Sequence, residues 1–178
     1  MTSNPTCYSY IDSPLGKICL QGDGEFVTGL HMPGHKHWRG VDPAWRKSDA
    51  SFAAVREQLA EYFAGDRQHF DAPLKLAGTP FQQLVWQELT RIPFGETISY
   101  AELARRVGRV TATRAVGNAN GRNPISIIVP CHRVIAADGK LTGYGGGLDK
   151  KEWLLAWEQR SKQPEPRSLF DMAGSKPR

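Results

Sequence analysis

The sequence has few cysteines and no long apolar run, and each absence excludes a class of protein. Its three cysteines, Cys7, Cys19 and Cys131, are odd in number and irregularly spaced. This argues against a disulfide framework and for a reducing, cytoplasmic compartment. The longest apolar stretch, from Ile125 to Val134, is interrupted by polar residues and is too short to cross a bilayer. The N-terminus has no basic region followed by an apolar one, so we expect no signal peptide.

Paired metal-ligand spacing is missing as well. Cys7, Cys19 and the histidines at positions 31, 35, 37 and 69 form no recognisable ligand pattern, so we expect no metal and no other cofactor.

Acidic residues are absent from one basic segment. The formal net charge is +5; residues 1–78 carry eight basic and nine acidic residues, whereas residues 79–160 carry eleven and seven. Between Arg105 and Arg122 there are five arginines and no acidic residue. Such a block favours a polyanionic partner, although an ordinary solvated basic face has the same charge pattern.

The first half of the chain predicts a small sheet with one helix. Alternating residues over 7–32 predict a meander of short antiparallel strands. Residues 33–48 are expected to form a loop. An apolar stripe that begins after Ser51 predicts a helix ended by Gly65. We place a domain boundary near residue 78.

The second half predicts helices with clear start signals. Thr79 before Pro80 is a typical N-cap, and this helix is expected to run to Ile92. Ser99, with Glu102 three residues later, predicts a capping box at the start of a second helix.

A third short helix, ended by Gly121, follows a glycine-containing turn. The pair of helices fits a helix-turn-helix motif and an ordinary helical hairpin equally well. Ile125–Pro130 predicts a buried strand. Lys150–Arg160 predicts a last helix on which Glu158 shares the inward stripe, and a buried carboxylate there needs a partner.

Together these patterns predict an α+β protein with an N-terminal domain over residues 1–78 and a C-terminal domain over residues 79–160. Residues 161–178 are rich in proline and poor in apolar residues, which is typical of a disordered basic tail. Leu169 and Phe170 resemble the end of a sliding-clamp-binding peptide, but the preceding residues do not fit, so an idle tail is favoured.

Cys131 stands beside His132 and Arg133. A cysteine reacts as its thiolate and therefore needs a base or a positive field. Neighbouring side chains on an extended strand point to opposite faces, so His132 must act through a bend or a water molecule. Cysteine proteases carry the two groups far apart in sequence, which leaves a thiol hydrolase poorly supported.

The motif PCHRVI, followed by TGYGGG and KEWLL, resembles the O6-alkylguanine-DNA alkyltransferases, and so do ISYAELA and RAVGNANGRNPI. The resemblance runs from the SPLGK turn to Glu158. It implies a ribonuclease-H-like N-terminal domain and a C-terminal winged helix-turn-helix domain, in the stand-alone bacterial form. It also implies irreversible, stoichiometric transfer of an alkyl group from O6-alkylguanine, and from O4-alkylthymine, to the protein's own cysteine.

The resemblance assigns a role to each catalytic position. Cys131 is the alkyl acceptor, His132 the base that acts through a water, and Glu158 the carboxylate that orients this base. Such a relay is expected to lower the pKa of the thiol. Asn123 holds the turn before the active-site strand. Tyr100 hydrogen-bonds the guanine and helps to neutralise it as a leaving group.

The same resemblance places the substrate pocket after the cysteine. The carbonyls of Cys131 and Val134 accept from the guanine amino group, the amide of Gly145 reaches O6, and Tyr144 and Gly146 line the pocket. Animal members of the family carry serine at the Gly145 position, which bears on loop flexibility and on the size of alkyl group accepted.

Some members of the family bind zinc in the N-terminal domain. His31 matches one ligand, but Asp23 stands where a cysteine is needed, so no zinc is expected.

DNA would be bound through the minor groove, with little sequence specificity, by a monomer that could bind cooperatively. Arg114 resembles the finger that enters the base stack when the nucleotide is rotated out. The expected DNA-binding residues lie on or beside the third helix and are Thr113, Arg114, Ala115, Gly117, Asn118 and Ala119. The alternative is a winged-helix DNA-binding protein that transfers nothing, and Cys131 argues against it.

Overall fold

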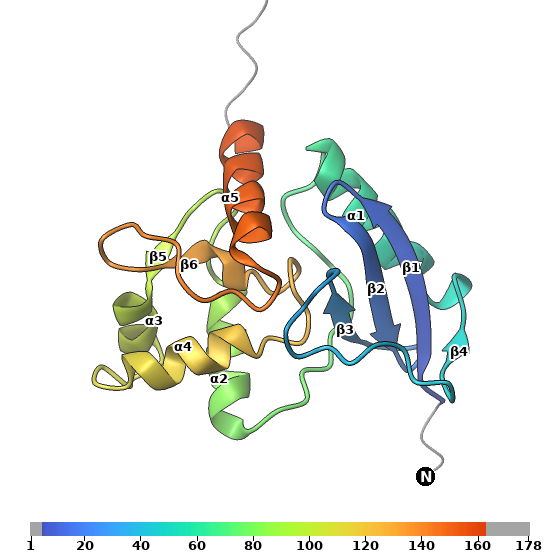
Figure 1. The fold of residues 1–178 in the computed structure, drawn as a ribbon, viewed down its shortest axis with the longest axis horizontal. Coiled ribbons are helices and arrows are strands. Elements are labelled where there is room, and N and C mark those ends of the chain that lie inside the picture. Colours follow the sequence, from blue (N-terminus) through green and yellow to red (C-terminus); the bar gives the residue numbers. More distant parts are fainter. Residues whose placement is uncertain (1–4, 163–178) are drawn as a thin grey trace, which may run out of the picture.

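A four-stranded sheet and one long helix form the N-terminal half of the computed structural model, which describes residues 5–162 (Figure 1). The strands are β1 (Cys7–Ser13), β2 (Gly16–Gly22), β3 (Val27–His31) and β4 (Arg46–Lys47), in the order β3-β2-β1-β4. The predicted antiparallel meander is confirmed for β1, β2 and β3. β4 pairs parallel to β1 within the segment expected to be a loop, so that prediction was wrong for Arg46 and Lys47.

The helix after the sheet is preceded by a short 3-10 turn, η1 (Ala50–Phe52), and runs as α1 (Ala53–Ala64). It ends as predicted at Gly65, whose φ of 89° is a left-handed conformation that glycine adopts without strain. Val55, Leu59 and Tyr62 are the buried residues of α1.

The C-terminal half contains four helices and a two-stranded pair. These elements are α2 (Pro80–Leu89), β5 (Ile98–Ser99), α3 (Tyr100–Arg106), α4 (Thr113–Gly121), η2 (Cys131–Arg133), β6 (Val134–Ile135) and α5 (Leu148–Lys162). The parallel pairing of β5 with β6 was not predicted. In Figure 1, α5 stands beside the sheet half while α2, α3 and α4 gather at the other end.

The predicted helix starts are confirmed, with two corrections. Thr79 accepts a hydrogen bond from Gln82 N, and Ser99 accepts one from Glu102 N at 3.0 Å. α2 ends at Leu89 rather than Ile92. The Glu102 carboxylate does not complete the expected capping box, because it is bound instead by two arginines of the same helix.

The segment Ile125–Pro130 is buried, as expected, but it is not a strand. It is closed by local turn bonds, such as Val129 N to Ile125 O at 3.0 Å, and Ile127 has a φ of 72°, which is unusual for a β-branched residue. An apolar run of this length cannot be distinguished from a buried turn by periodicity alone.

The last helix is longer than predicted. α5 begins at Leu148 rather than Lys150, and it continues through Ser161 and Lys162, which were assigned to the tail. Residues 163–178, including Leu169 and Phe170, lie outside the described residues. No helix within the described part of the chain is long and apolar enough to span a membrane.

Candidate active site and nucleic-acid interface

Cys131 begins η2, directly after the buried turn, and its side chain is enclosed. The residue is 4% exposed, and its Sγ accepts a hydrogen bond from Asn123 Nδ2 at 3.0 Å. Asn123 also donates to Val129 O at 2.7 Å and accepts from Ile125 N at 3.0 Å. The position of Asn123 therefore agrees with its expected part in holding the turn.

Burial raises the pKa of the Cys131 thiol, and this effect exceeds the lowering by the Asn123 hydrogen bond and by the charge of Lys151. The expectation of a lowered thiol pKa is therefore not met in this structure. A thiol of this kind stays protonated at neutral pH and needs a base at the moment of reaction.

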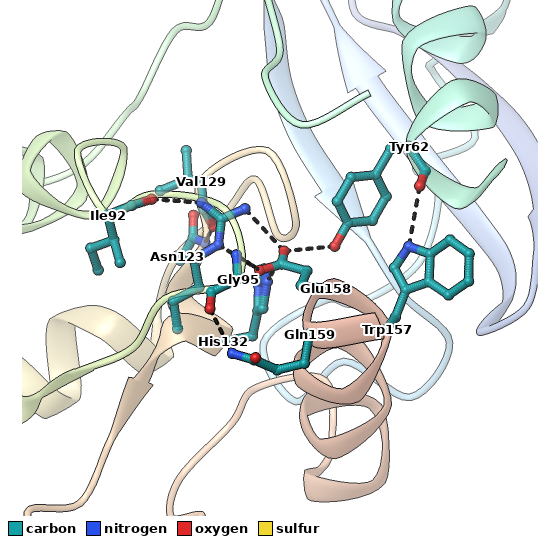
Figure 2. Close-up of polar contacts among 10 residues, drawn as sticks. Tyr62, Ile92, Gly95, Asn123, Val129, His132, Trp157, Glu158 and Gln159 are labelled. Atoms are coloured by element: carbon teal, nitrogen blue, oxygen red, sulfur yellow. Dashed lines mark hydrogen bonds and ion pairs between the residues drawn. The ribbon is translucent and has the colours of Figure 1, made fainter. Parts of the chain in front are cut away.

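The Glu158 carboxylate gathers four donor residues at the centre of the protein (Figure 2). His132 Nε2 lies 2.7 Å from Oε1, and Arg133 reaches both oxygens, with Nε and Nη2 each at 2.9 Å. Tyr62 donates its hydroxyl to Oε1 at 2.8 Å, and Gly95 donates its amide to Oε2 at 3.0 Å. The inward carboxylate predicted from the helical stripe thus has its partners.

These contacts determine the protonation states of Glu158 and His132. Burial alone would raise the pKa of Glu158, but His132 and Arg133 together bring it well below its ordinary value. Burial lowers the pKa of His132, although Glu158 opposes this shift. An ionised Glu158 accepts the proton of Nε2, so Nδ1 is the unprotonated nitrogen. That nitrogen is buried and has no protein partner among residues 5–162.

Arg133 and Tyr62 were not predicted as parts of the site. Arg133 additionally donates to Ile92 O at 2.6 Å. Its place beside Cys131 was visible in the sequence, but nothing local indicates that its guanidinium would bind the carboxylate of α5. Tyr62 belongs to α1, so its contact depends on how the two halves pack.

Lys151 is a second buried charge that sequence reasoning missed. Its Nζ donates to Val134 O at 2.7 Å and Thr142 O at 3.0 Å, and lies 3.5 Å from the Tyr100 hydroxyl. Burial lowers its pKa to about 8. A signal was present, because Lys151 precedes Glu158 by seven positions and lies on the same helical stripe.

The predicted substrate carbonyls are already engaged. Val134 O accepts from Lys151, and Cys131 O accepts from Asn120 Nδ2 at 3.3 Å. A carbonyl has two lone pairs, so each can accept one further hydrogen bond. Their predicted contact with a guanine amino group remains a prediction.

The loop after β6 closes over the cysteine from the other side. The Tyr100 hydroxyl donates to Thr142 O at 3.0 Å, and burial raises the pKa of Tyr100. The Tyr144 hydroxyl is buried close to Cys131 and Ser126, although neither meets full hydrogen-bond geometry. A Cβ at Gly145 would lie 2.7 Å from His35 Nε2, and one at Gly146 would lie 2.7 Å from Met32 Cε.

The helix pair α3–α4 presents an exposed face beside this loop. Thr113, Arg114, Ala115 and Asn118 are exposed, and Gly117 is partly so. A wide cleft of about 780 Å³ lies between this face and Tyr100. One prediction was wrong: Ala119 is only 3% exposed, and its carbonyl accepts from Trp86 Nε1 at 2.8 Å. Ala119 therefore packs beneath α4 rather than facing a ligand.

Two of the five arginines between Arg105 and Arg122 already have an acidic partner, which the charge pattern of this segment alone does not indicate. Glu102 binds Arg105 Nη2 at 2.7 Å and Arg106 Nε at 2.8 Å. Arg109, Arg114 and Arg122 form no ion pair with any described residue. Phosphate contacts are therefore expected from Arg109 and Arg122 rather than from Arg105 and Arg106.

The N-terminal histidines do not form a metal cluster. His31 Nε2 lies 3.3 Å from Gln21 Oε1, the ring stacks on Trp38 at 5.4 Å, and burial lowers its pKa to about 4. Over residues 5–162 no group of three or more histidine, cysteine or acidic side chains is placed to hold a metal ion.

The buried thiol of Cys131 lies beside the pair of His132 and Glu158, which makes it a candidate acceptor cysteine. The exposed helix pair α3–α4 lies next to it and is a candidate DNA-binding face. Two family models match the chain. Residues 80–160 match the DNA binding domain of 6-O-methylguanine DNA methyltransferase, and residues 6–76 match its ribonuclease-like domain. The chain belongs to the 6-O-methylguanine DNA methyltransferase family.

Individual relatives agree with this. The methylated-DNA–protein-cysteine methyltransferase of Mycolicibacterium paratuberculosis is 49% identical over 92% of this chain and 98% of its own length. The protein of that name from Mycobacterium tuberculosis H37Rv is 50% identical, with the same coverage of both chains. The crystal structure of Mycobacterium tuberculosis OGT in complex with DNA matches with a TM-score of 0.82 and 50% identity, over 87% of this chain and 94% of that one.

Proposed function

We propose that this protein repairs DNA by moving an alkyl group from O6-alkylguanine, and from O4-alkylthymine, to Cys131 in a single irreversible turnover. The observation that carries the proposal is the arrangement around the thiol. Cys131 Sγ is buried with one neutral donor, and the adjacent His132 is held by an ionised Glu158 with its second nitrogen unprotonated.

The chemistry follows from these contacts. The thiol proton passes through a water molecule to His132 Nδ1, and Glu158 stabilises the imidazolium that forms. The thiolate attacks the alkyl carbon, the bond from carbon to O6 breaks, and the guanine leaves with its electron pair. Tyr100, whose hydroxyl now donates to Thr142 O, would turn to the base and neutralise it. The product is a thioether on Cys131, which water does not cleave under ordinary conditions, so the reaction would be stoichiometric.

DNA binding is proposed to use the exposed face of α4 in the minor groove. Guanine O6 lies within the paired stack, so the nucleotide has to be rotated out at a cost of a few kcal/mol. The wide cleft between Tyr100 and Arg114 would receive it. Arg114 would fill the vacated space, and the remaining contacts would be to phosphates, with little sequence preference and with a monomer as the binding unit.

Intact mass after exposure to duplex DNA that contains O6-methylguanine tests the proposal. We expect one methyl group per chain, mapped to Cys131, and no further turnover. Cys131→Ser is expected to gain nothing while its DNA affinity stays within a few-fold, because affinity comes mainly from phosphate contacts. Cys7→Ser and Cys19→Ser are the matched controls and are expected to react. DNA binding without any mass change would instead indicate a binding protein.

A further inference from the structure

The loop between β3 and β4 of the N-terminal half touches the loop that covers the cysteine. The Lys36 amide donates to Gly145 O at 2.7 Å. His35 Nε2 lies 2.7 Å from the position that a Cβ of residue 145 would take. His35 itself is 7% exposed, and burial lowers its pKa, so it packs here as a neutral ring. The backbone at Lys36 is therefore fixed against the active-site loop.

A polar cleft of about 410 Å³ opens at this junction. Its side-chain lining comes from both halves of the chain and consists of Lys36, His37, Asn118, Arg122 and Tyr144. None of its lining residues in the described part of the chain is acidic. The cleft shares Gly117, Asn118 and Gly143 with the wider cleft in front of Tyr100, so the two are adjacent.

The two cationic side chains of this cleft, Lys36 and Arg122, have no ion-pair partner among the described residues. Both are exposed. By contrast, Lys17, Lys75, Arg105 and Arg106 all have carboxylate partners. Two unpaired cations around a cleft without carboxylates create a local positive potential, which attracts an anion. Phosphate oxygens are the usual partners of such lysine and arginine side chains in DNA complexes.

We propose that Lys36 and Arg122 together bind a backbone phosphate of bound DNA beside the active-site loop. The inference rests on the proposed function, which brings DNA to the adjacent face of α4. It gives the N-terminal half a direct part in DNA binding. The Lys36 amide holds Gly145 O while the Lys36 side chain holds the phosphate, so bound DNA would also hold the loop in place.

The test is the salt dependence of binding to unmodified duplex DNA, measured for the full chain. Each neutralised phosphate contributes a slope of about −0.9 to the plot of log affinity against log salt. Lys36→Ala and Arg122→Ala are each expected to reduce the slope by about one unit. Because the two side chains bind one phosphate together, the double variant is expected to lose little more than either single variant. A loss of about two units would contradict the shared phosphate. Lys36→Arg retains the charge and is expected to retain most of the slope.

Lys17→Ala is the matched control, because Lys17 lies in the same half and is 60% exposed at the β1–β2 turn. We expect its slope to equal that of the unaltered protein. A slope for Lys36→Ala that equals the Lys17→Ala slope would overturn the inference. Thermal unfolding of each variant checks that the fold is intact.

The outcome is separable from the proposed function. The duplex used for binding carries no lesion, so the slope does not depend on alkyl transfer. The unaltered protein is exposed in parallel to O6-methylguanine DNA, and its mass is measured. Failure to gain a methyl group with a reduced Lys36→Ala slope would refute the transfer and support the phosphate contact. Methylation of the unaltered protein with an unreduced Lys36→Ala slope would support the transfer and refute the phosphate contact.

Discussion

Glu158 has more partners than a carboxylate needs for orienting one histidine. It is fully buried and accepts from Tyr62, Gly95, His132 and Arg133. Removing one partner of a buried ion pair leaves an uncompensated charge and typically costs about 3–5 kcal/mol. The residue therefore has two effects that experiments must separate. It raises the pKa of His132, and it holds α5 against the rest of the protein.

Glu158→Gln is expected to slow alkylation of Cys131 by a free O6-substituted guanine, which needs no rotation out of a duplex. Without the ionised carboxylate, His132 is a weaker base and takes up the thiol proton less readily. The apparent pKa of the Cys131 thiol, measured as the pH of half-maximal rate, is therefore expected to rise. The measurement is the pH dependence of inactivation by that base. An unshifted profile would mean that Glu158 acts only as a structural partner of Arg133.

Stability should respond to pH in a defined direction. Because the folded-state pKa of Glu158 is depressed, its contribution is complete above about pH 4.3, the ordinary glutamate value, and is lost as pH falls through the folded value. The stability difference between the unaltered protein and Glu158→Gln should therefore narrow in acid. Tyr62→Phe is the control: it removes one donor to the same carboxylate, should cost about 1 kcal/mol, and should leave the pH–rate profile unshifted.

At the residue scale the sequence predicts positions better than partners. The helical stripe was enough to place Glu158 inside, and the same stripe could have placed Lys151. The contact of Tyr62 with Glu158 joins positions 96 apart, and no local pattern encodes it. Ala119 was predicted to face DNA but is buried. The prediction failed because small residues on one helix are equally suited to packing and to close approach by a ligand.

Among the elements, α3 and α4 carry the strongest functional expectation. The start of α3 and the turn before α4 follow from local chemistry: the Ser99 cap and Gly108, whose φ is 69°. The turn that carries Asn123 does not, since its conformation depends on side-chain bonds to Ile125 and Val129 and on burial between the two halves. The sequence therefore predicted the helices correctly and the strand before Cys131 incorrectly.

Arg114→Ala is expected to slow repair of duplex DNA by far more than it weakens binding. Arg114 is exposed on α4 at the edge of the wide cleft and has no ion-pair partner in the described chain. If it fills the space left by the rotated nucleotide, its loss affects a step that free O6-substituted guanine does not need. The measurement compares single-turnover rates on both substrates with the duplex dissociation constant.

Arg109→Ala is the matched control on the turn between α3 and α4. Arg109 is exposed and also lacks an ion pair among residues 5–162. As a phosphate contact, it should lower the salt slope by about one unit, with a repair defect explained by affinity alone. If Arg114→Ala behaves in the same way, or is equally impaired on both substrates, the finger assignment is wrong.

At the scale of the whole molecule, the two halves share a core. Leu30 of β3 donates to Pro124 O at 2.9 Å and accepts from Ser126 N at 3.3 Å, so the sheet half holds the turn before Cys131. Trp157 Nε1 donates to Tyr62 O at 3.1 Å, and this contact joins α5 to α1 (Figure 2). The change in charge and composition near residue 78 indicates two units, but it contains no information on how they pack.

We therefore expect the protein to unfold in one cooperative transition. Native-state hydrogen exchange should give the amides of β2 and α2 the same limiting free energy of opening. Tyr62→Phe, which weakens a contact between the halves, should lower both values equally. Two separate transitions, or a loss confined to one half, would show that the halves are independent domains.

The contact between residues 35 and 145 has a consequence for sequence exchange within the family. A Cβ at residue 145 would lie 2.7 Å from His35 Nε2 and 3.0 Å from Gly121 O, so a side chain there requires the imidazole opposite to move. We expect Gly145→Ser to be tolerated better when residue 35 is smaller than histidine, because the imidazole is the nearest side chain. Substitutions at 35 and 145 are therefore expected to be coupled across the halves of the chain, and a chimera that joins the halves of two relatives would combine residues at this contact that come from different proteins.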